Sequence, residues 1–224
     1  MKSVRSLAAL AVMSLGMVGA ASAQLLVNGG FEDTGGATAQ GWGGYTYGAG
    51  YSSPLPGWTV SGNVDIVPLA PWVPPKEGTK SLDLVGFAQG SISQTFATVE
   101  NAAYTLTFWY SKNVASSPNP SQAEVELTGI QGGTWSQIVS VTDAMAGGPN
   151  NMLWTGFSKN FVAAGSQATL SFSDVNGANS GGVFIDAVSV VPEPEAYGLA
   201  LAGVGVVGWF HAKRRRPGNQ NPVV

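Results

Sequence analysis

The sequence contains no cysteine and only one histidine, His211, close to its carboxyl end. Without thiols the chain can form neither disulfides nor thiolate metal sites, and it has no cysteine nucleophile. Without an imidazole between residues 24 and 191, one chain cannot assemble a Ser-His-Asp triad, a histidine-ligated zinc or a histidine general base. These absences exclude the common cysteine-based and histidine-based enzyme classes.

Positive charge is also scarce in the body of the chain. Residues 24–191 hold four lysines and no arginine against eleven aspartates and glutamates, which gives a net charge of −7. A surface of this sign repels a polyanion such as nucleic acid, so we expect no nucleic acid as a partner. The other six basic residues lie at the two ends: Lys2, Arg5, Lys213, Arg214, Arg215 and Arg216.

The amino-terminal end has the pattern of a secretory signal peptide. Lys2 and Arg5 precede an apolar run from Leu7 to Val18, and "ASA" at residues 21–23 is the small-residue pattern that signal peptidase reads. An uncleaved anchor is the alternative, but a run of about 12 residues is shorter than the roughly 20 that span a bilayer. We therefore predict a signal peptide at 1–23, export of the chain, and a mature chain that begins at Gln24.

Residues 24–191 have the alternation of β-strands and no long helical period. In "AYTLTFWYS", for example, large apolar side chains at Tyr104, Leu106 and Phe108 alternate with threonines. The pattern predicts an all-β domain, a two-sheet antiparallel β-sandwich, with no strand between residues 34 and 56 and a loop at 146–152. Nine strands are expected, at 64–67, 81–85, 91–97, 103–111, 123–128, 136–142, 154–162, 168–174 and 182–191.

Several motifs resemble those of a known family when they are taken in order. They are "LLVNGGFEDTG", "PLPGWTVSGNVDIVP", "EGTKSLDLVGFAQGSISQTFAT", "YTLTFWYSKN" and "GGVFIDAVSVVPEPE". This set resembles the DUF642-related, choice-of-anchor C group of secreted bacterial proteins, which are similar in turn to galactose-binding-like jelly rolls, including carbohydrate-binding modules. The resemblance implies a galactose-binding-like jelly roll and a non-catalytic domain that binds polysaccharide or cell-wall glycan.

Two carboxylates stand in apolar strand contexts, Glu32 in "GGFED" and Asp186 in "VFIDAVSV". A buried carboxylate is costly unless it is paired or coordinated, and oxygen ligands suit Ca²⁺. The resemblance to carbohydrate-binding jelly rolls implies a structural Ca²⁺ held by Glu32, Asp186 and backbone carbonyls near Thr79 and Lys80. In the alternative interpretation, Asp186 accepts backbone amides or pairs with Lys80, and Glu32 is solvated.

Aromatic residues in glycine-rich and proline-rich loops are the candidates for sugar binding. Sugars present C–H faces that stack on tryptophan and tyrosine rings, and glycine neighbours leave such rings accessible. Local packing of a long loop is the alternative interpretation. The candidates are Trp42, Tyr45, Tyr47, Tyr51 and Trp72.

A carboxylate-dependent glycan hydrolase is a less favoured alternative. Two carboxylates at the correct separation would suffice for that chemistry, without histidine. Glu32 and Asp186 are one such pair, and Glu124 with Glu126 is another. The latter two share one strand face at i and i+2, which is more typical of a solvated stripe than of a cleft, so we predict that the protein is not an enzyme.

The carboxyl-terminal end has three parts: "PEP" at Pro192, Glu193 and Pro194, an apolar run of 15 residues from Ala196 to Phe210, and a basic cluster that includes Arg214, Arg215 and Arg216. As a helix the run is about 22 Å long, which is marginal for a permanent anchor. The prolines favour an extended, exposed peptide just outside that helix. A plain carboxyl-terminal anchor is the alternative.

This arrangement resembles the PEP-CTERM sorting signal, which is recognised and removed by exosortase in Gram-negative bacteria that make exopolysaccharide. The resemblance implies a sorting signal at residues 192–216, transient inner-membrane anchoring through 196–212, and a disordered tail at 217–224. The sequence thus predicts an exported cell-surface or extracellular-matrix protein. A structural surface protein that acts through protein contacts, without binding sugar, is the other class left open.

Overall fold

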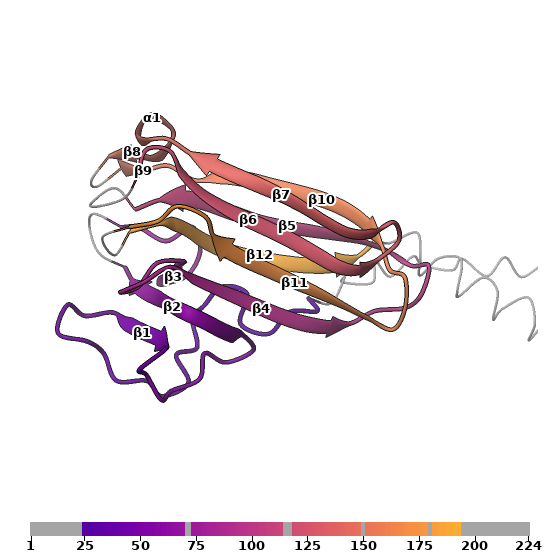
Figure 1. The fold of residues 1–224 in the computed structure, drawn as a ribbon, viewed down its shortest axis with the longest axis horizontal. Helices are drawn as coiled ribbons and strands as arrows, with labels where there is room; N and C mark the ends of the chain where they lie inside the picture. Colours follow the sequence, from indigo (N-terminus) through magenta and orange to yellow (C-terminus); the bar gives the residue numbers. More distant parts are fainter. Residues whose placement is uncertain (1–23, 70–72, 114–117, 149–150, 179–180, 194–224) are drawn as a thin grey trace, which may run out of the picture.

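The computed structural model describes residues 24–69, 73–113, 118–148, 151–178 and 181–193, and Figure 1 shows their arrangement. Within these ranges the chain is built of β-strands and one short helix, α1 (Asp143–Ala146). The strands are β1 (Tyr45–Gly48), β2 (Thr59–Pro68), β3 (Lys80–Asp83), β4 (Gly90–Ala97), β5 (Ala103–Lys112), β6 (Ser121–Ile130), β7 (Gly133–Val141), β8 (Gly147–Gly148), β9 (Asn151–Met152), β10 (Thr155–Val162), β11 (Gln167–Asp174) and β12 (Val183–Pro192).

The main sheet is antiparallel and folds back on itself at β2. Its strand order is β10-β5-β12-β3-β2-β4-β11-β6-β7, with β1 paired to β2. The first part of β2, Thr59–Gly62, pairs with β4, whereas the later part, Asp65–Pro68, pairs with β3. One strand therefore belongs to both halves of the sheet, which form the two layers of a β-sandwich (Figure 1).

Aromatic side chains fill the space between the two layers. Phe108 on β5 meets Phe172 on β11 edge to face, with ring centroids 4.9 Å apart, and Phe96 on β4 meets Phe161 on β10 at 6.4 Å. Along β5 the buried residues alternate with less buried ones, as the sequence pattern predicts. All nine predicted strands are present, and the predicted two-layer antiparallel β-sandwich is confirmed.

A glycine permits the corner at which β2 passes from one layer to the other. Gly62 has a φ of +68°, in the left-handed region that favours glycine. A Cβ atom at this position would lie 2.0 Å from the backbone oxygen of Gln89, so no other residue fits without a backbone shift. The corner therefore depends on a residue without a side chain.

The first described residues tie the two layers together. The Leu25 amide donates to the Val190 oxygen (3.0 Å), so this segment lies alongside β12. On the other side, the buried Gln94 amide group of β4 exchanges two hydrogen bonds with the backbone of Val27, at 2.7 and 2.9 Å. The segment from Gln24 to Val27 is thus held between a strand of each layer, where the first and last strands of a jelly roll can meet.

Three short strands differ from the sequence prediction. Residues 34–56 were expected to hold no strand, but Tyr45–Gly48 form β1 against β2, and the expected loop at 146–152 contains the hairpin of β8 and β9. The hairpin is held by a small second hydrophobic cluster, which includes Met152 of β9. Trp154 packs against the four buried residues of this cluster. They are Val67, Val73, Met152 and Phe184.

The last strand continues into the region predicted to be an exposed peptide. Pro192 is buried and lies opposite Tyr104, and the Glu193 amide donates to the Ala103 oxygen at 2.9 Å. The Thr105 hydroxyl hydrogen-bonds the Glu193 carboxylate. The peptide is extended, as expected, but sheet pairing buries its first residue, so the predicted exposure is wrong for Pro192.

Three sequence predictions concern residues outside the described ranges: the signal peptide at 1–23, the apolar helix at 196–212 and the tail at 217–224. Pro194 and the three arginines of the basic cluster lie outside them as well. The helix found in the described part of the chain is too short to cross a bilayer.

We predict that Gly62→Ala lowers the free energy of unfolding by roughly 3–5 kcal/mol, because the added Cβ meets backbone and the φ is unfavourable. Gly36→Ala is the matched control, since Gly36 has a φ of +75° and an added Cβ would meet nothing within 4 Å. That change should cost only about 1 kcal/mol. Urea unfolding measures both, and equal losses would contradict the role of the corner.

Candidate functional site

Two aromatic rings form a stacked pair at one end of the sandwich. Phe87, at the tip of the turn between β3 and β4, is 65% exposed. Its ring lies parallel to that of Tyr51, with an interplanar angle of 5° and centroids 6.2 Å apart. The turn and the loop after β1 thus present an aromatic platform at the surface.

A groove adjoins this platform. It has a volume of about 370 Å³, and its walls include Tyr51, Trp58 and the hydroxyl residues Ser52, Ser53 and Thr59. Most of the Trp58 ring is buried in the core, and its Nε1 donates to the Asn28 oxygen at 3.1 Å. An apolar surface next to hydroxyl groups suits a sugar ring, which has both C–H faces and hydroxyls.

A buried carboxylate holds the turn that presents Phe87. Asp83 is 2% exposed, and its Oδ1 accepts hydrogen bonds from the amides of Val85 (3.0 Å) and Gly182 (3.1 Å). Its Oδ2 accepts from Asn113 Nδ2 at 2.9 Å. Desolvation raises the pKa of Asp83 to about 8, although hydrogen bonds from Asn113 and Val85 act in the opposite direction.

Two more aspartates lie near Asp83. The Asp174 Oδ2 accepts from Gln89 Nε2 (2.9 Å) and from the Gly177 amide (2.6 Å), which links the turn to the end of β11. Desolvation raises the pKa of Asp174, and it raises the pKa of Asp65 to about 6. The negative charges of Asp65 and Asp174 raise the pKa of Asp83 further. The protonation of Asp83 is therefore coupled to that of the other two carboxyl groups.

The predicted aromatic candidates separate into three groups. Trp42 is 47% exposed and Tyr51 belongs to the platform, so both rings are accessible. Tyr45 is half-buried against the core, and Tyr47 is fully buried, with its hydroxyl donating to the Thr34 oxygen at 2.9 Å. Tyr47 is therefore a correction, because a buried ring cannot stack on a sugar. Trp72 lies outside the described residues.

Phe87 was not among the candidates for sugar binding predicted from the sequence, although its sequence context indicates an exposed ring. It stands in "VGFAQG", where glycines flank a short turn between two predicted strands. A large apolar residue at such a tip has no strand partner and no core to enter, so exposure is expected.

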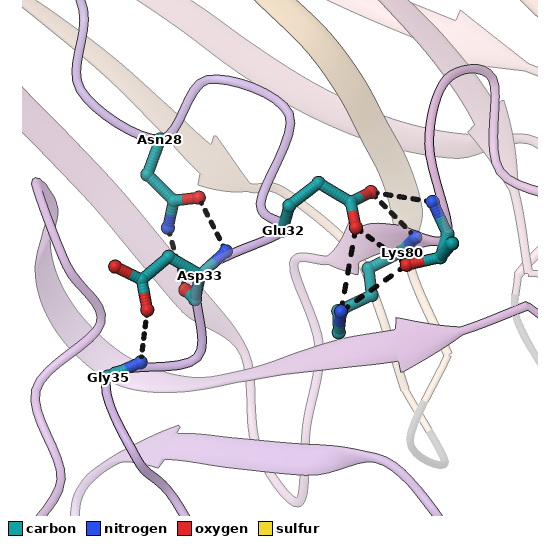
Figure 2. A network of polar contacts seen from close by, with 6 residues as sticks. Asn28, Glu32, Asp33, Gly35 and Lys80 are labelled. Atoms are coloured by element: carbon teal, nitrogen blue, oxygen red, sulfur yellow. Dashed lines mark hydrogen bonds and ion pairs between the residues drawn. The ribbon is translucent and has the colours of Figure 1, made fainter.

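The Glu32 carboxylate holds the loop before β3, as Figure 2 shows. Its Oε1 accepts from the amides of Thr79 (2.7 Å) and Lys80 (2.9 Å). Its Oε2 accepts from the Thr79 hydroxyl (2.6 Å) and lies 3.5 Å from Lys80 Nζ. Desolvation acts to raise the pKa of Glu32, but these hydrogen bonds outweigh it, so the pKa of Glu32 is lowered.

Asp186 holds the same loop from the other side. It is fully buried, and its Oδ2 accepts from the amides of Lys76 (2.7 Å) and Glu77 (3.0 Å). Its Oδ1 accepts from the Ala187 amide at 2.6 Å. Desolvation raises the pKa of Asp186 to about 6, against the effect of these three hydrogen bonds.

The contacts of Glu32 and Asp186 bear on the predicted Ca²⁺. All four carboxylate oxygens face N–H or O–H donors, and the Lys80 ammonium adds a positive charge at Glu32. In the described part of the chain, no group of three Asp, Glu, His or Cys residues is placed to hold a metal. The contacts favour the alternative in which Asp186 accepts amides; Glu32, however, is not simply solvated. Calcium at Glu32, Lys80 and Asp186 stays a prediction.

The other carboxylate pair that was considered for catalysis lies on an open sheet face. Glu124 and Glu126 are half-buried on β6, opposite Ser173 and Ser171 of β11. The groove beside Tyr51 is lined without any carboxylate. Neither pair is therefore placed across this groove, as an acid and a base would have to be.

Comparisons with known families identify two segments of the chain. Residues 24–191 match DUF642, which is described as a protein of unknown function. Residues 190–216 match the PEP-CTERM protein-sorting motif. Both resemblances predicted from the sequence are confirmed. No curated protein matches the sequence.

Among the solved structures that are similar to this chain, TmCBM61 supports the jelly-roll fold. TmCBM61 in complex with β-1,4-galactotriose is 18% identical, with a TM-score of 0.53 over 77% of this chain and 100% of that chain. The Family 16 Carbohydrate Binding Module-2 is 20% identical, with a TM-score of 0.39 over 57% of this chain and 84% of that chain. The CBM22-1 xylan-binding domain from Paenibacillus barcinonensis Xyn10C is 16% identical, with a TM-score of 0.41 over 61% and 85% of the two chains.

We predict that stability falls as the pH rises from about 6 to 8. The pKa of Asp83 is raised to about 8 in the folded protein. A group of this kind stabilises the fold below its unfolded pKa and loses that contribution as the pH rises through its folded pKa. Asp83 contributes at most about 1.4 kcal/mol per pH unit to the decrease in the free energy of unfolding. Urea unfolding at several pH values should show that Asp83→Asn flattens this part of the profile.

The control for the pH profile is Glu100→Gln, at an exposed carboxylate in the turn after β4. This change should leave the slope between pH 6 and 8 as it is in the unaltered protein. A slope that survives in Asp83→Asn would show that another group causes it. Asp65 and Asp186, whose pKa values are raised to about 6, should account for the remaining slope at lower pH.

We predict that Asp186→Ala lowers the free energy of unfolding by about 2–3 kcal/mol, because it leaves three backbone amides without an acceptor in a buried place. Glu32→Ala should cost less, about 1 kcal/mol, since water reaches the exposed Thr79 and Lys80 amides. Thermal unfolding with added Ca²⁺ or EDTA tests the ion. A melting temperature that rises with Ca²⁺, but not in Asp186→Ala, would assign Ca²⁺ to this loop.

Proposed function

We propose, because this chain belongs to the DUF642 family and carries a PEP-CTERM protein-sorting motif, that it is an exported surface or matrix protein whose β-sandwich binds polysaccharide without altering it. The observation that carries the binding proposal is the stacked pair of the half-buried Tyr51 and the exposed Phe87 beside a groove lined with hydroxyl groups. An exosortase would process the sorting motif, and the apolar run at 196–212 would hold the chain in the inner membrane until then.

The stacked pair offers the kind of surface that a sugar ring recognises. Stacking on Tyr51 holds the Phe87 ring in place, and the carbons of a pyranose can lie against the exposed part of that ring while its hydroxyls point outward. Ser52, Ser53 and Thr59 in the groove can then exchange hydrogen bonds with those hydroxyls. Trp42, which is 47% exposed, provides a further accessible ring before β1, whereas Tyr51 lies after that strand.

The absence of catalysis is part of the proposal. The groove contains no carboxylate among its lining residues, and the described body has no histidine or cysteine. Glu32 and Asp186 are occupied with backbone amides of one loop. The carboxylates near the groove, at Asp83 and Asp174, hold the turn instead of facing an open cleft.

We predict that Phe87→Ala and Tyr51→Ala each weaken binding of a neutral β-linked galactan by about tenfold or more, because each change removes half of the stacked pair. β-1,4-Galactotriose is the first probe, since the similar fold of TmCBM61 was solved with it. Titration calorimetry with the purified full chain gives the affinities. Trp42→Ala, measured in parallel, shows whether the surface extends along the loop.

Val99→Ala is the control, because Val99 is 67% exposed but lies after β4, away from the groove. It should bind as the unaltered protein does. Full affinity in both Phe87→Ala and Tyr51→Ala would contradict the site. Failure to bind any member of a glycan array would favour the structural alternative, and release of reducing sugar would favour the hydrolase.

A further inference from the structure

The two ends of the curled sheet meet along a seam that backbone hydrogen bonds close at one end only, where the Gln131 amide donates to the Val162 oxygen. β10 and β7 are the first and last strands of the sheet order and do not pair with each other. Their side chains make the contact: the rings of Trp135 on β7 and Phe157 on β10 have centroids 6.1 Å apart. Because the seam is closed by side chains, it can open into a cavity where they are small.

A cavity of about 280 Å³ lies at one end of this seam, where β6 turns into β7. Its walls include Trp135, Lys159 and the apolar side chains of Ile130 and Phe161, and its rim is formed by the turn at residues 131–134. Gly132 and Gly133, in that turn, have positive φ values, and an added Cβ would meet nothing within 4 Å at either position. The mouth of the cavity is therefore open.

Lys159 gives this cavity a positive charge in an acidic molecule. Its Nζ lies 4.9 Å from the centroid of the Trp135 ring. Among the described residues it has no carboxylate within ion-pair distance, whereas Lys80 and Lys112 lie 3.5 and 3.0 Å from acidic partners. The lining of the cavity contains no carboxylate either. The net charge of −7 acts against an anion at long range, but an ammonium group without a carboxylate beside it can pair with one sugar carboxylate at hydrogen-bond distance.

We propose that this cavity is a second glycan site, and that it binds a uronate residue of an acidic polysaccharide. The sugar carboxylate pairs with Lys159, the C–H groups contact Trp135 and the apolar wall, and the Thr134 hydroxyl bonds a sugar hydroxyl. The cavity is at the small end of the range for ligand sites, which suits one sugar ring better than a folded partner. This site goes beyond the neutral-glycan groove at Tyr51, because it involves other residues and a charged ligand.

The two sites lie at opposite ends of the strands. The turn with Phe87 leads into the start of β4, which pairs with the end of β11 at Ser173. The cavity adjoins the other end, where Gln131 donates to the Val162 oxygen at 2.8 Å and Ile130 bridges to Ala163. β4 has eight residues, so its length separates the two sites by about 26 Å.

The test is titration calorimetry of the purified full chain with tetragalacturonate and with its methyl-esterified form, which lacks the charges. We expect the acid to bind and the ester to bind at least about tenfold more weakly. Binding of the acid should also weaken between about 0.05 and 0.5 M NaCl. Absence of binding, or equal binding of acid and ester, would overturn the proposal.

Lys159→Met keeps the aliphatic packing and removes the charge, so it should weaken binding of the acid by about tenfold. Lys76→Met is the matched control, because Lys76 Nζ also lies over a tryptophan ring, 3.6 Å from the centroid of Trp109, but does not line the cavity. Equal losses in both variants, or no loss in Lys159→Met, would overturn the site. Tight binding of tetraglutamate by the same residues would overturn the ligand class.

The tests of the cavity at Lys159 can be distinguished from those of the neutral-glycan groove at Tyr51. Lys159→Met should bind β-1,4-galactotriose as the unaltered protein does, and Phe87→Ala should bind tetragalacturonate as the unaltered protein does. Loss of both ligands in Lys159→Met would indicate misfolding or a single shared site, and either would overturn the second site. The near-ultraviolet circular dichroism of each variant identifies misfolding.

Discussion

The structure depends on a close approach of three backbone segments at the corner of β2. A Cβ on Gly48 would lie 2.1 Å from the Gly62 oxygen, and a Cβ on Gly90 would lie 2.3 Å from the Asn63 oxygen. Side chains at these points would force β1, β2 and β4 apart. Because β2 is the strand that the two layers share, its bend sets how the layers face each other. The aromatic core between the layers forms only when this corner is made.

The same corner determines where the aromatic platform of Tyr51 and Phe87, the proposed binding surface, is located. Gly90 ends the turn that carries Phe87, and Gly48 begins the loop that carries Tyr51, so bringing the two glycines together also brings the two rings together. Asp83 then fixes the turn through backbone amides, although burying its carboxyl group costs free energy. A perturbed carboxyl group beside a binding surface is common in proteins, and here it supports the surface without facing a ligand.

The sequence could predict the sandwich because its strands are half-buried, and half-burial leaves an alternation of two that can be read without a structure. β1, β8 and β9 escaped the prediction because two to four residues carry too little periodicity. Tyr47 and Tyr51 stand in the same glycine-rich stretch, and only the pairing of β1 with β2 decides that Tyr47 turns inward while Tyr51 reaches Phe87. For the same reason the partners of Glu32, which are 47 and 48 residues away along the chain, could not be read from its neighbours.

The close connection between the last strand and the sorting motif suggests a use for two glycan sites on one small domain. β12 pairs as far as Pro192 and Glu193 bonds to Ala103, so the folded body runs into the sorting motif at residues 190–216 without a linker. If the sorting motif holds the chain at the membrane, as we propose, a body joined to it this closely would have little freedom to search for a ligand. The two proposed sites, about 26 Å apart at opposite ends of the strands, would let one molecule hold two segments of a matrix, and the second contact would then form at a high effective concentration. Weak individual sites of this kind suffice for retention, because release requires both to open at once.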